Sequence, residues 1–310
     1  MTPFQRPFRF GLIVETGQTT RQALFEQARR AEDAGCSIIL GTDHFGRLST
    51  LPMLQAGAQA TNLRIGTLVL NNDFRHPVVL VQDLAALDVL TEGRLEIGLG
   101  AGWDKPEYAA GGMTFDPAGQ RVDRLIASVG MLKQALENGR IERAADGAYP
   151  AISLPVMPRS FQRPYPPFLI GGGGRRMLSF AAREANIVGL DPRALPEGGH
   201  DPTDVTAAAI DRKIGWVREA AGDRWASLEI NIIVFEVVSG NGRPAGASVG
   251  RTYGLGAEEL RSSPHYLSTD AAEMTEQLLA RRERWGISYF VLRPSQLEAV
   301  APAISRLAGS

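Results

Sequence analysis

Residues 64–100 read RIGTLVLNNDFRHPVVLVQDLAALDVLTEGRLEIGLG, and this stretch contains two candidate strands with a candidate helix between them. Residues 64–70 and 95–99 are short aliphatic runs, which favour β-strands. Within residues 77–90, leucines recur at spacings of four and three, which places them on one helical face, and Pro77 suits the first turn. Strand, helix and strand in this order form the repeating unit of a parallel sheet.

The same alternation continues in both directions along the chain. Strands are expected at residues 8–14, 37–40, 64–70, 95–99, 167–170, 186–190, 228–238 and 287–292, with helices after most of them. Eight such units are the number that closes a parallel barrel, whereas a doubly wound open sheet usually stops near six strands. The sequence therefore predicts an α/β fold, a (β/α)8 TIM barrel, as a single domain over residues 1–310.

Two long segments do not fit the minimal unit and are expected to be insertions. Residues 140–166, after the fourth helix, contain five prolines, and residues 239–268, after the seventh strand, are rich in Gly, Ser and Pro. Loops of this length within a compact domain are usually functional or mobile. The second insertion is therefore a candidate lid.

Composition narrows the class of partner. The net charge is −1, from 33 basic and 34 acidic residues, so the chain has no overall basic field for nucleic acid or an anionic membrane. No stretch approaches the roughly 20 apolar residues of a membrane span. Cys36 is the one cysteine, which excludes an internal disulfide and a multi-cysteine metal site. We expect a cytoplasmic protein that acts on a small molecule.

Chemistry in such barrels lies at the carboxyl ends of the strands. The residues expected there are two carboxylates and a histidine near the first two strands, an amide after the third, and two glycine-rich turns: Glu15, Asp43, His44, Asn71, Gly100 to Trp103, Gly171 to Gly174, and Asp191. Asp43 with His44 could form an acid/base pair. In the alternative reading, Asp43 caps a turn while His44 packs.

The glycine run at residues 171–174 is a candidate phosphate site. Glycine lets a backbone approach a ligand closely, the following helix start offers free N–H groups, and Arg175 and Arg176 add positive charge. In the alternative reading, the glycines only relieve strain in a tight turn. The small residues Gly100, Ala101 and Gly102 could likewise give a flat surface for a planar ring or only relieve crowding.

Other features predict no chemistry. The four histidines include no H-x-H or H-E-x-x-H pair, so no metal site is expected, and no G-x-S-x-G elbow supports a serine nucleophile. His200 lies in a run typical of a surface loop. No expected strand ends in lysine, which argues against a phosphate-handling aldolase or isomerase.

A series of short motifs spans nearly the whole chain in a fixed order. They are Thr42-Asp-His-Phe45, Gly66-Thr-Leu-Val-Leu-Asn71, Arg75-His-Pro77 leading to Leu87-Asp88, Gly98-Leu-Gly-Ala-Gly-Trp103, Glu107-Tyr108, Arg121-Val-Asp-Arg124, Ile170-Gly-Gly-Gly-Gly174 and Arg281-Arg-Glu-Arg-Trp-Gly-Ile-Ser-Tyr289. In order and spacing they resemble the bacterial luciferase-like family of flavin and deazaflavin barrel enzymes, particularly its F420-dependent branch.

The resemblance implies that coenzyme F420 lies in the barrel mouth. It implies a non-proline cis peptide in a bulge at Leu68 and Val69, behind the cofactor ring. It also implies hydride transfer to or from a bound organic substrate, with His44 as the first candidate for the accompanying proton, Asp43 orienting either His44 or the cofactor, and Glu15 as the second candidate. The cofactor contacts it implies are Asp43, His44, Leu68, Val69, Asn71, Gly100, Ala101, Gly102, Trp103, Gly171, Gly172, Gly173, Gly174, Arg175, Arg176 and Leu190.

Some alternatives remain open within this resemblance. FMN has the same ring outline and also carries a phosphate, so an FMN-dependent monooxygenase is the second hypothesis, and a barrel that binds a flavin without catalysis is the third. Sugar-phosphate dehydrogenases of the family carry a glutamate where this chain has Trp103, which points to a less polar substrate. Homodimers are common in the family, although no interface signature stands out in this chain.

Overall fold

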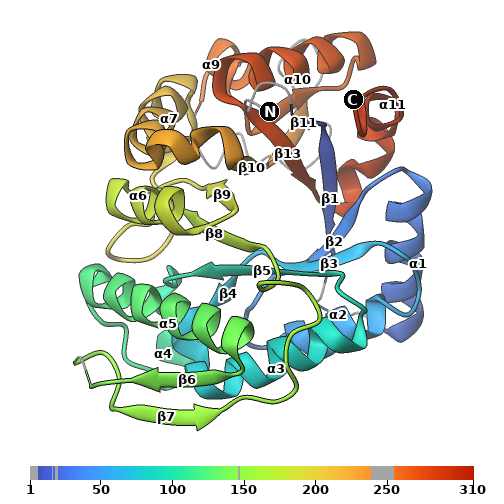
Figure 1. Ribbon diagram of the computed structural model, residues 1–310. Coiled ribbons are helices and arrows are strands. Elements are labelled where there is room, and N and C mark those ends of the chain that lie inside the picture. Colours follow the sequence, from blue (N-terminus) through green and yellow to red (C-terminus); the bar gives the residue numbers. More distant parts are fainter. Residues whose placement is uncertain (1–5, 16, 18–19, 146, 239–254) are drawn as a thin grey trace.

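Eight parallel strands form a closed ring in the computed structural model, which describes residues 6–15, 17, 20–145, 147–238 and 255–310 (Figure 1). The strands are β1 (Arg9–Ile13), β2 (Ile38–Gly41), β3 (Arg64–Thr67), β5 (Leu95–Gly100), β8 (Phe168–Gly172), β9 (Ile187–Leu190), β10 (Glu229–Ile233) and β13 (Ile287–Leu292). They pair in the order β3-β2-β1-β13-β10-β9-β8-β5, and β3 also pairs with β5. The predicted (β/α)8 barrel is confirmed.

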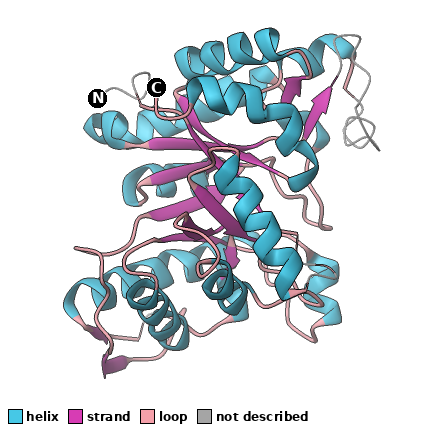
Figure 2. Cartoon of the chain, turned by 90° about the vertical axis from the view of Figure 1, so that its right-hand side faces the viewer, coloured by secondary structure: helices cyan, strands magenta, loops and turns pink. Residues whose placement is uncertain are grey.

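Helices surround this ring, as Figures 1 and 2 show from two directions. They are α1 (Arg21–Asp33), α2 (Thr50–Gly57), α3 (Pro77–Leu90), α4 (Lys105–Ala110), α5 (Ala118–Asn138), α6 (Arg175–Glu184), α7 (Ala207–Ala221), α9 (Ala257–Ser262), α10 (Ala271–Trp285) and α11 (Leu297–Leu307). Short 3-10 turns are η2 (Asn72–Phe74), η3 (Pro202–Val205), η4 (Gly222–Ser227) and η5 (Pro294–Gln296). Among the helices that these bounds describe, none is both long enough and apolar enough to cross a membrane.

Local signals explain where the helices begin and end. The Thr20 side chain accepts a hydrogen bond from the Ala23 N–H, which caps α1. Gly139 adopts a φ of 72° directly after α5, a left-handed conformation that glycine tolerates best. The amphipathic pattern of the sequence predicts a helix over residues 122–136, whereas α5 begins four residues earlier, and no pattern predicts α4.

The third strand is interrupted where the cofactor bulge is expected. Leu68 and Val69 are joined by a cis peptide bond between β3 and β4 (Leu70–Asn71), as the family resemblance implied. At the interruption, the Thr67 hydroxyl donates to the Gly98 carbonyl and accepts from the Gly98 N–H, both at 2.8 Å. A side chain therefore replaces the ladder bonds between the two strands at this position.

The segment expected as one long strand at 228–238 is two strands. β10 belongs to the barrel, whereas β11 (Glu236–Val238) leaves it and pairs in parallel with β12 (Tyr266–Ser268). The second insertion thus contributes β12 and α9 to the described structure. Residues 239–254, the greater part of the candidate lid, lie outside the described residues.

The first insertion holds a hairpin that the sequence did not predict. β6 (Arg140–Arg143) and β7 (Ile152–Pro155) pair antiparallel at the periphery, at the lower left of Figure 1. Ile141 in β6 and Ile152 and Leu154 in β7 are more buried than their neighbours, which gives the hairpin one apolar face. The prolines of this segment are typical of an irregular loop, so the sequence does not indicate the hairpin.

Apolar side chains fill the barrel interior in one cluster, and a larger cluster lies between strands and helices. The interior cluster comprises Ile13, Ile38, Leu40, Leu68, Leu169, Ile187, Tyr289 and Val291. Beneath it, at the amino ends of the strands, Arg9 binds Glu96 and Glu229 at 2.7 Å each, and Arg64 binds Glu96 at 2.6 Å. The core therefore closes one end of the barrel and leaves the carboxyl end open.

Candidate active site

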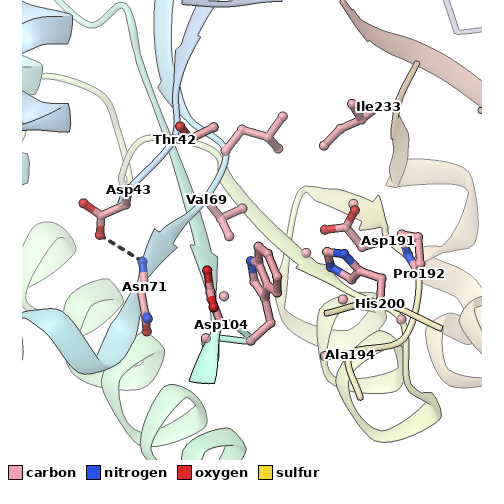
Figure 3. A pocket seen from close by; sticks show the side chains of 18 of the residues that line it. Thr42, Asp43, Val69, Asn71, Asp104, Asp191, Pro192, Ala194, His200 and Ile233 are labelled. Carbon is pink, nitrogen blue, oxygen red and sulfur yellow. Dashed lines mark hydrogen bonds between the residues drawn. The ribbon is translucent and has the colours of Figure 1, made fainter. Parts of the chain in front are cut away.

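A cavity of about 520 Å³ opens at the carboxyl ends of the barrel strands. It is lined by residues that follow the strands, among them Glu15, Asp43, His44, Leu68, Val69, Asn71, Gly100, Ala101, Gly102, Trp103, Gly171, Gly172, Gly173, Leu190 and Asp191. Figure 3 shows Asp43 and Asn71 on one side of it and Asp191, Pro192 and His200 on the other. The cavity lies where the sequence placed the chemistry, and its volume is within the roughly 300–1,000 Å³ typical of ligand pockets.

Of the two roles expected for Asp43, orienting His44 is not seen, because the Asp43 carboxylate is bound by other neighbours. Arg75 donates to both carboxylate oxygens at 2.6 and 2.9 Å. The backbone N–H of Asn71 and the hydroxyl of Thr50 donate to the same carboxylate at 3.1 and 3.2 Å. Both carboxylate oxygens of Asp43 therefore accept hydrogen bonds from the protein, and they link the end of β2 to the segment after β3.

Glu107 is the residue that orients His44. The Nδ1 atom of His44 lies 3.1 Å from Oε2 and 3.2 Å from Oε1 of Glu107, and the Phe45 N–H donates to Glu107 at 2.7 Å. Glu107 belongs to α4, which the Asp104 side chain caps through the Glu107 N–H. A carboxylate on one imidazole nitrogen leaves Nε2 as the nitrogen that can exchange a proton with a ligand. Glu107 was noted only as part of a motif.

Asn71 and Gly102 are held together at the rim by Tyr108. The Tyr108 hydroxyl donates to Asn71 Oδ1 at 3.0 Å. Gly102 has a φ of 78°, and a Cβ there would lie 2.1 Å from that hydroxyl. The glycine is therefore required by close packing and backbone conformation, which supports the crowding alternative at this position.

The glycine turn after β8 divides into two parts. Gly171 to Gly173 line the cavity, and Gly174 precedes α6 with no side chain capping the helix. Arg175 and Arg176 do not line the cavity. Arg175 pairs with Glu219 at 2.9 Å and Arg176 pairs with Asp123, and both guanidinium groups are largely exposed.

Trp103, Asp191 and His200 form the opposite wall. The Trp103 and His200 ring centroids lie 4.5 Å apart, and those of His44 and Trp103 lie 6.2 Å apart with the rings nearly perpendicular. Burial raises the pKa of the Asp191 carboxyl, and the nearby His200 and Lys213 partly oppose this rise. His200 lies in a loop with exposed residues, as expected, but it is half-buried and lines the cavity together with Pro192 and Ala194.

Asp204 holds the loop that carries His200 in place. Its buried carboxylate accepts from the Arg193 N–H at 2.8 Å and pairs with Arg212 at 2.9 Å and with Lys213 at 2.8 Å. An antiparallel bridge joins Ala194 to His200. These contacts tie the loop to α7, and no local sequence pattern would have indicated them.

Glu15 lies at the mouth of the cavity and is exposed, directly after β1. Across the described ranges of the chain, no group of three or more His, Cys, Asp or Glu side chains could hold a metal ion. The arrangement offers an imidazole with an orienting carboxylate, a second carboxyl on the opposite wall and a glycine-lined floor. Such a site can hold a planar ligand and move a proton beside it.

Residues 6–218 match the model of the luciferase-like monooxygenase family, and the chain belongs to this family. An F420-dependent glucose-6-phosphate dehydrogenase from Amycolatopsis mediterranei is 29% identical over 160 residues, 48% of this chain and 47% of that protein. An F420-dependent hydroxymycolic acid dehydrogenase from Mycobacterium tuberculosis is 27% identical over 222 residues, 62% of this chain and 59% of that protein. The chain thus spans about half the length of the first relative.

A solved structure extends the likeness to the whole fold. Coenzyme F420 dependent tetrahydromethanopterin reductase from Methanopyrus kandleri superposes with a TM-score of 0.75 at 17% identity, over 97% of this chain and 99% of that chain. At this identity the comparison supports the barrel and its topology.

Proposed function

We propose that this chain is an oxidoreductase that uses coenzyme F420 to transfer a hydride to or from a small organic substrate. The observation that supports this most is the cavity itself, which places a glycine-lined floor, the Leu68–Val69 bulge and the His44–Glu107 pair around one space. The F420-dependent activities named for its relatives in Amycolatopsis and Mycobacterium point the same way.

The residues present fit such a cofactor. A Cβ on Gly171 would lie 3.4 Å from Cγ1 of Val69, so a side chain there would fill the space beside the bulge. At Gly174 a Cβ would have no atom within 4 Å, which leaves open space in front of the α6 N-terminus. The first-turn N–H groups and the helix dipole favour an anion at that end.

The residues that line the cavity would divide the binding of the cofactor and the transfer of the proton among them. Gly171 to Gly174 and the start of α6 would hold the phosphate, Val69 and the turn from Gly100 to Gly102 would support the ring, and Asn71 and Leu190 would bound it. When bound, F420 supplies a two-electron hydride carrier. His44, held by Glu107, would exchange the accompanying proton through Nε2, with Glu15 as the second candidate. Asp43 would position the backbone of Asn71.

Arg175 and Arg176 remain candidates for a supporting charge near the phosphate. For direct contact with it, each would have to give up its pairing with Glu219 or Asp123. The backbone of the turn needs no such exchange, and we therefore assign the phosphate primarily to the backbone.

Titration of the purified protein with F420 and with FMN tests this proposal. We expect F420 fluorescence to be quenched on binding, with micromolar affinity, and FMN fluorescence to be unchanged. The reverse pattern, together with oxygen uptake in the presence of reduced FMN, would favour the monooxygenase alternative and overturn the proposal, because a deazaflavin does not activate oxygen in this way.

A further inference from the structure

The Asp191 carboxylate faces the cavity without a hydrogen-bond donor from the described part of the chain. Lys213 lies close, but its ammonium group donates to the backbone carbonyl of Asp191 at 2.7 Å and forms its ion pair with Asp204. Lys213 shares the Asp204 carboxylate with Arg212. Asp191 therefore lines the cavity with a carboxyl group that has His200 and Lys213 as charged neighbours but accepts no hydrogen bond from either of them.

Two aromatic rings lie on the same wall as this carboxylate. Trp103 and His200 are 4.5 Å apart between ring centroids with a tilt of 31°, and both line the cavity with Asp191. An indole face attracts a cation through its quadrupole, most strongly when water is excluded. A carboxylate beside such a face is the combination by which proteins recognise positively charged nitrogen groups.

The arginines that line the cavity do not favour an anion at this wall. Arg121 donates to the backbone carbonyls of Ala101, Gly102 and Asp116, and its guanidinium lies over the Phe115 ring. The other two, Arg47 and Arg293, are exposed. The positive groups that influence Asp191 are His200 and Lys213.

We propose that Asp191, Trp103 and His200 form a subsite for a positively charged nitrogen of the substrate. This inference rests on the proposed function, since it places the subsite beside the F420-binding floor. It specifies the substrate class as an organic cation, bound through the Asp191 carboxylate and the Trp103 face. The cation would make the direct contact with the Asp191 carboxylate that neither His200 nor Lys213 makes.

Choline and its uncharged isostere 3,3-dimethylbutan-1-ol are suitable probes, measured by calorimetry on the F420-loaded protein at pH 8. We expect choline to bind at least tenfold more tightly than the isostere. Asp191→Asn should abolish this preference and leave the affinity for the isostere within twofold, because only the charge is removed. Trp103→Leu should weaken choline binding by about threefold to tenfold, since the cation loses its aromatic face.

Asp104→Asn is the matched control. Asp104 also lines the cavity, but its carboxylate caps α4, a role that asparagine fills equally well. This variant removes a negative charge from the same cavity and should retain the choline preference within twofold. The comparison separates a specific Asp191 contact from the general field of the cavity.

The pH dependence gives a second readout. Choline affinity should rise with pH as the Asp191 carboxyl ionises, with His200 and Lys213 as the neighbouring charged groups, and should be flat for Asp191→Asn over the same range. Equal binding of the two probes, tighter binding of the anion 3,3-dimethylbutanoate, or an unchanged preference in Asp191→Asn would each overturn the subsite while F420 binding stands. Failure to bind F420 would overturn both proposals.

Discussion

Asp43 is the residue on which the rim beside the cofactor floor depends most. Its carboxylate joins the end of β2 to Arg75, the Asn71 backbone and the Thr50 hydroxyl. An isosteric amide keeps the shape but leaves the Arg75 guanidinium without its counter-charge. Removing one partner of a buried ion pair is costly because the other charge remains.

We expect Asp43→Asn to lower the free energy of unfolding by about 2 kcal/mol, less than for a fully buried pair because Arg75 is partly exposed. Urea denaturation measures this change. Asp123→Asn breaks the exposed pair with Arg176 and serves as the control, with an expected loss below about 0.5 kcal/mol. Equal losses in the two variants would contradict the anchoring role of Asp43.

His265, which does not line the cavity, should make the free energy of unfolding depend on pH. It is fully buried, stacks on Phe235 at 4.3 Å and bonds the Ile233 carbonyl through Nδ1 at 2.9 Å. The pKa of His265 is lowered to about 3, chiefly by burial and in smaller part by Lys213, Arg281 and His200, while the bond to the Ile233 carbonyl opposes the shift. An unfolded histidine has a pKa of about 6.5.

Between these pKa values the unfolded chain binds the proton and the folded chain does not, so stability should fall as pH drops from about 6.5 toward 3. The slope attributable to this residue is about 1.4 kcal/mol per pH unit. Urea denaturation at several pH values should show this slope in the wild type and its loss in His265→Asn, which keeps a donor for Ile233. A wild-type slope retained in the variant would assign the dependence to other groups.

At the scale of elements, the junction of β3 and β5 depends on Gly98. A Cβ at this position would lie 1.8 Å from the Thr67 carbonyl oxygen, a backbone atom that cannot move without breaking the strand pairing. Gly98→Ala should therefore lower the free energy of unfolding by about 3 kcal/mol or more. Thermal or urea unfolding measures this effect.

Gly130 supplies the contrast, because it lies within α5, is exposed, and has no atom within 4 Å of a Cβ. Gly130→Ala should stabilise the protein by roughly 0.5–1 kcal/mol through helix propensity. If both alanine variants were neutral, the close approach of β5 to Thr67 would not be maintained in solution.

Elements with local signals were predictable from the sequence, and those set by distant partners were not. The strand at 95–99 and the helix at 77–90 follow from periodicity, and the residues after the strands meet at one rim because parallel strands share a direction. The run at 228–238 contains no glycine or proline that would mark a break, so the departure of β11 depends on β12 about 30 residues later. Local patterns hold no such information.

The candidate site divides in the same way. Asp43, His44, Trp103 and the glycine turn lie at strand ends and could be named in advance. The Glu107 contact to His44 joins residues 63 positions apart. Likewise, His200 reaches the cavity through a loop whose path is set by buried Asp204. Contacts of this kind need the tertiary structure.

At the scale of the whole molecule, the barrel has a reactive end and a structural end. The ion network of Arg9, Arg64, Glu96 and Glu229 joins β1, β3, β5 and β10 below the interior cluster, opposite the cavity. Arg9 also lies over the Tyr289 ring at 4.4 Å. One ion network therefore links four strands that are distant in sequence.

Glu96→Gln tests the separation of the two ends. The variant breaks the Arg64–Glu96 ion pair and leaves Arg9 with Glu229 as its remaining carboxylate partner, so we expect the free energy of unfolding to fall by about 3 kcal/mol. The F420 affinity of the folded variant should stay within twofold of the wild type, since the network lies at the opposite end of the barrel. Glu298→Gln, which breaks an exposed pair with Arg30, should change neither quantity measurably. A large loss of F420 affinity in folded Glu96→Gln would instead mean that the two ends are coupled through the strands.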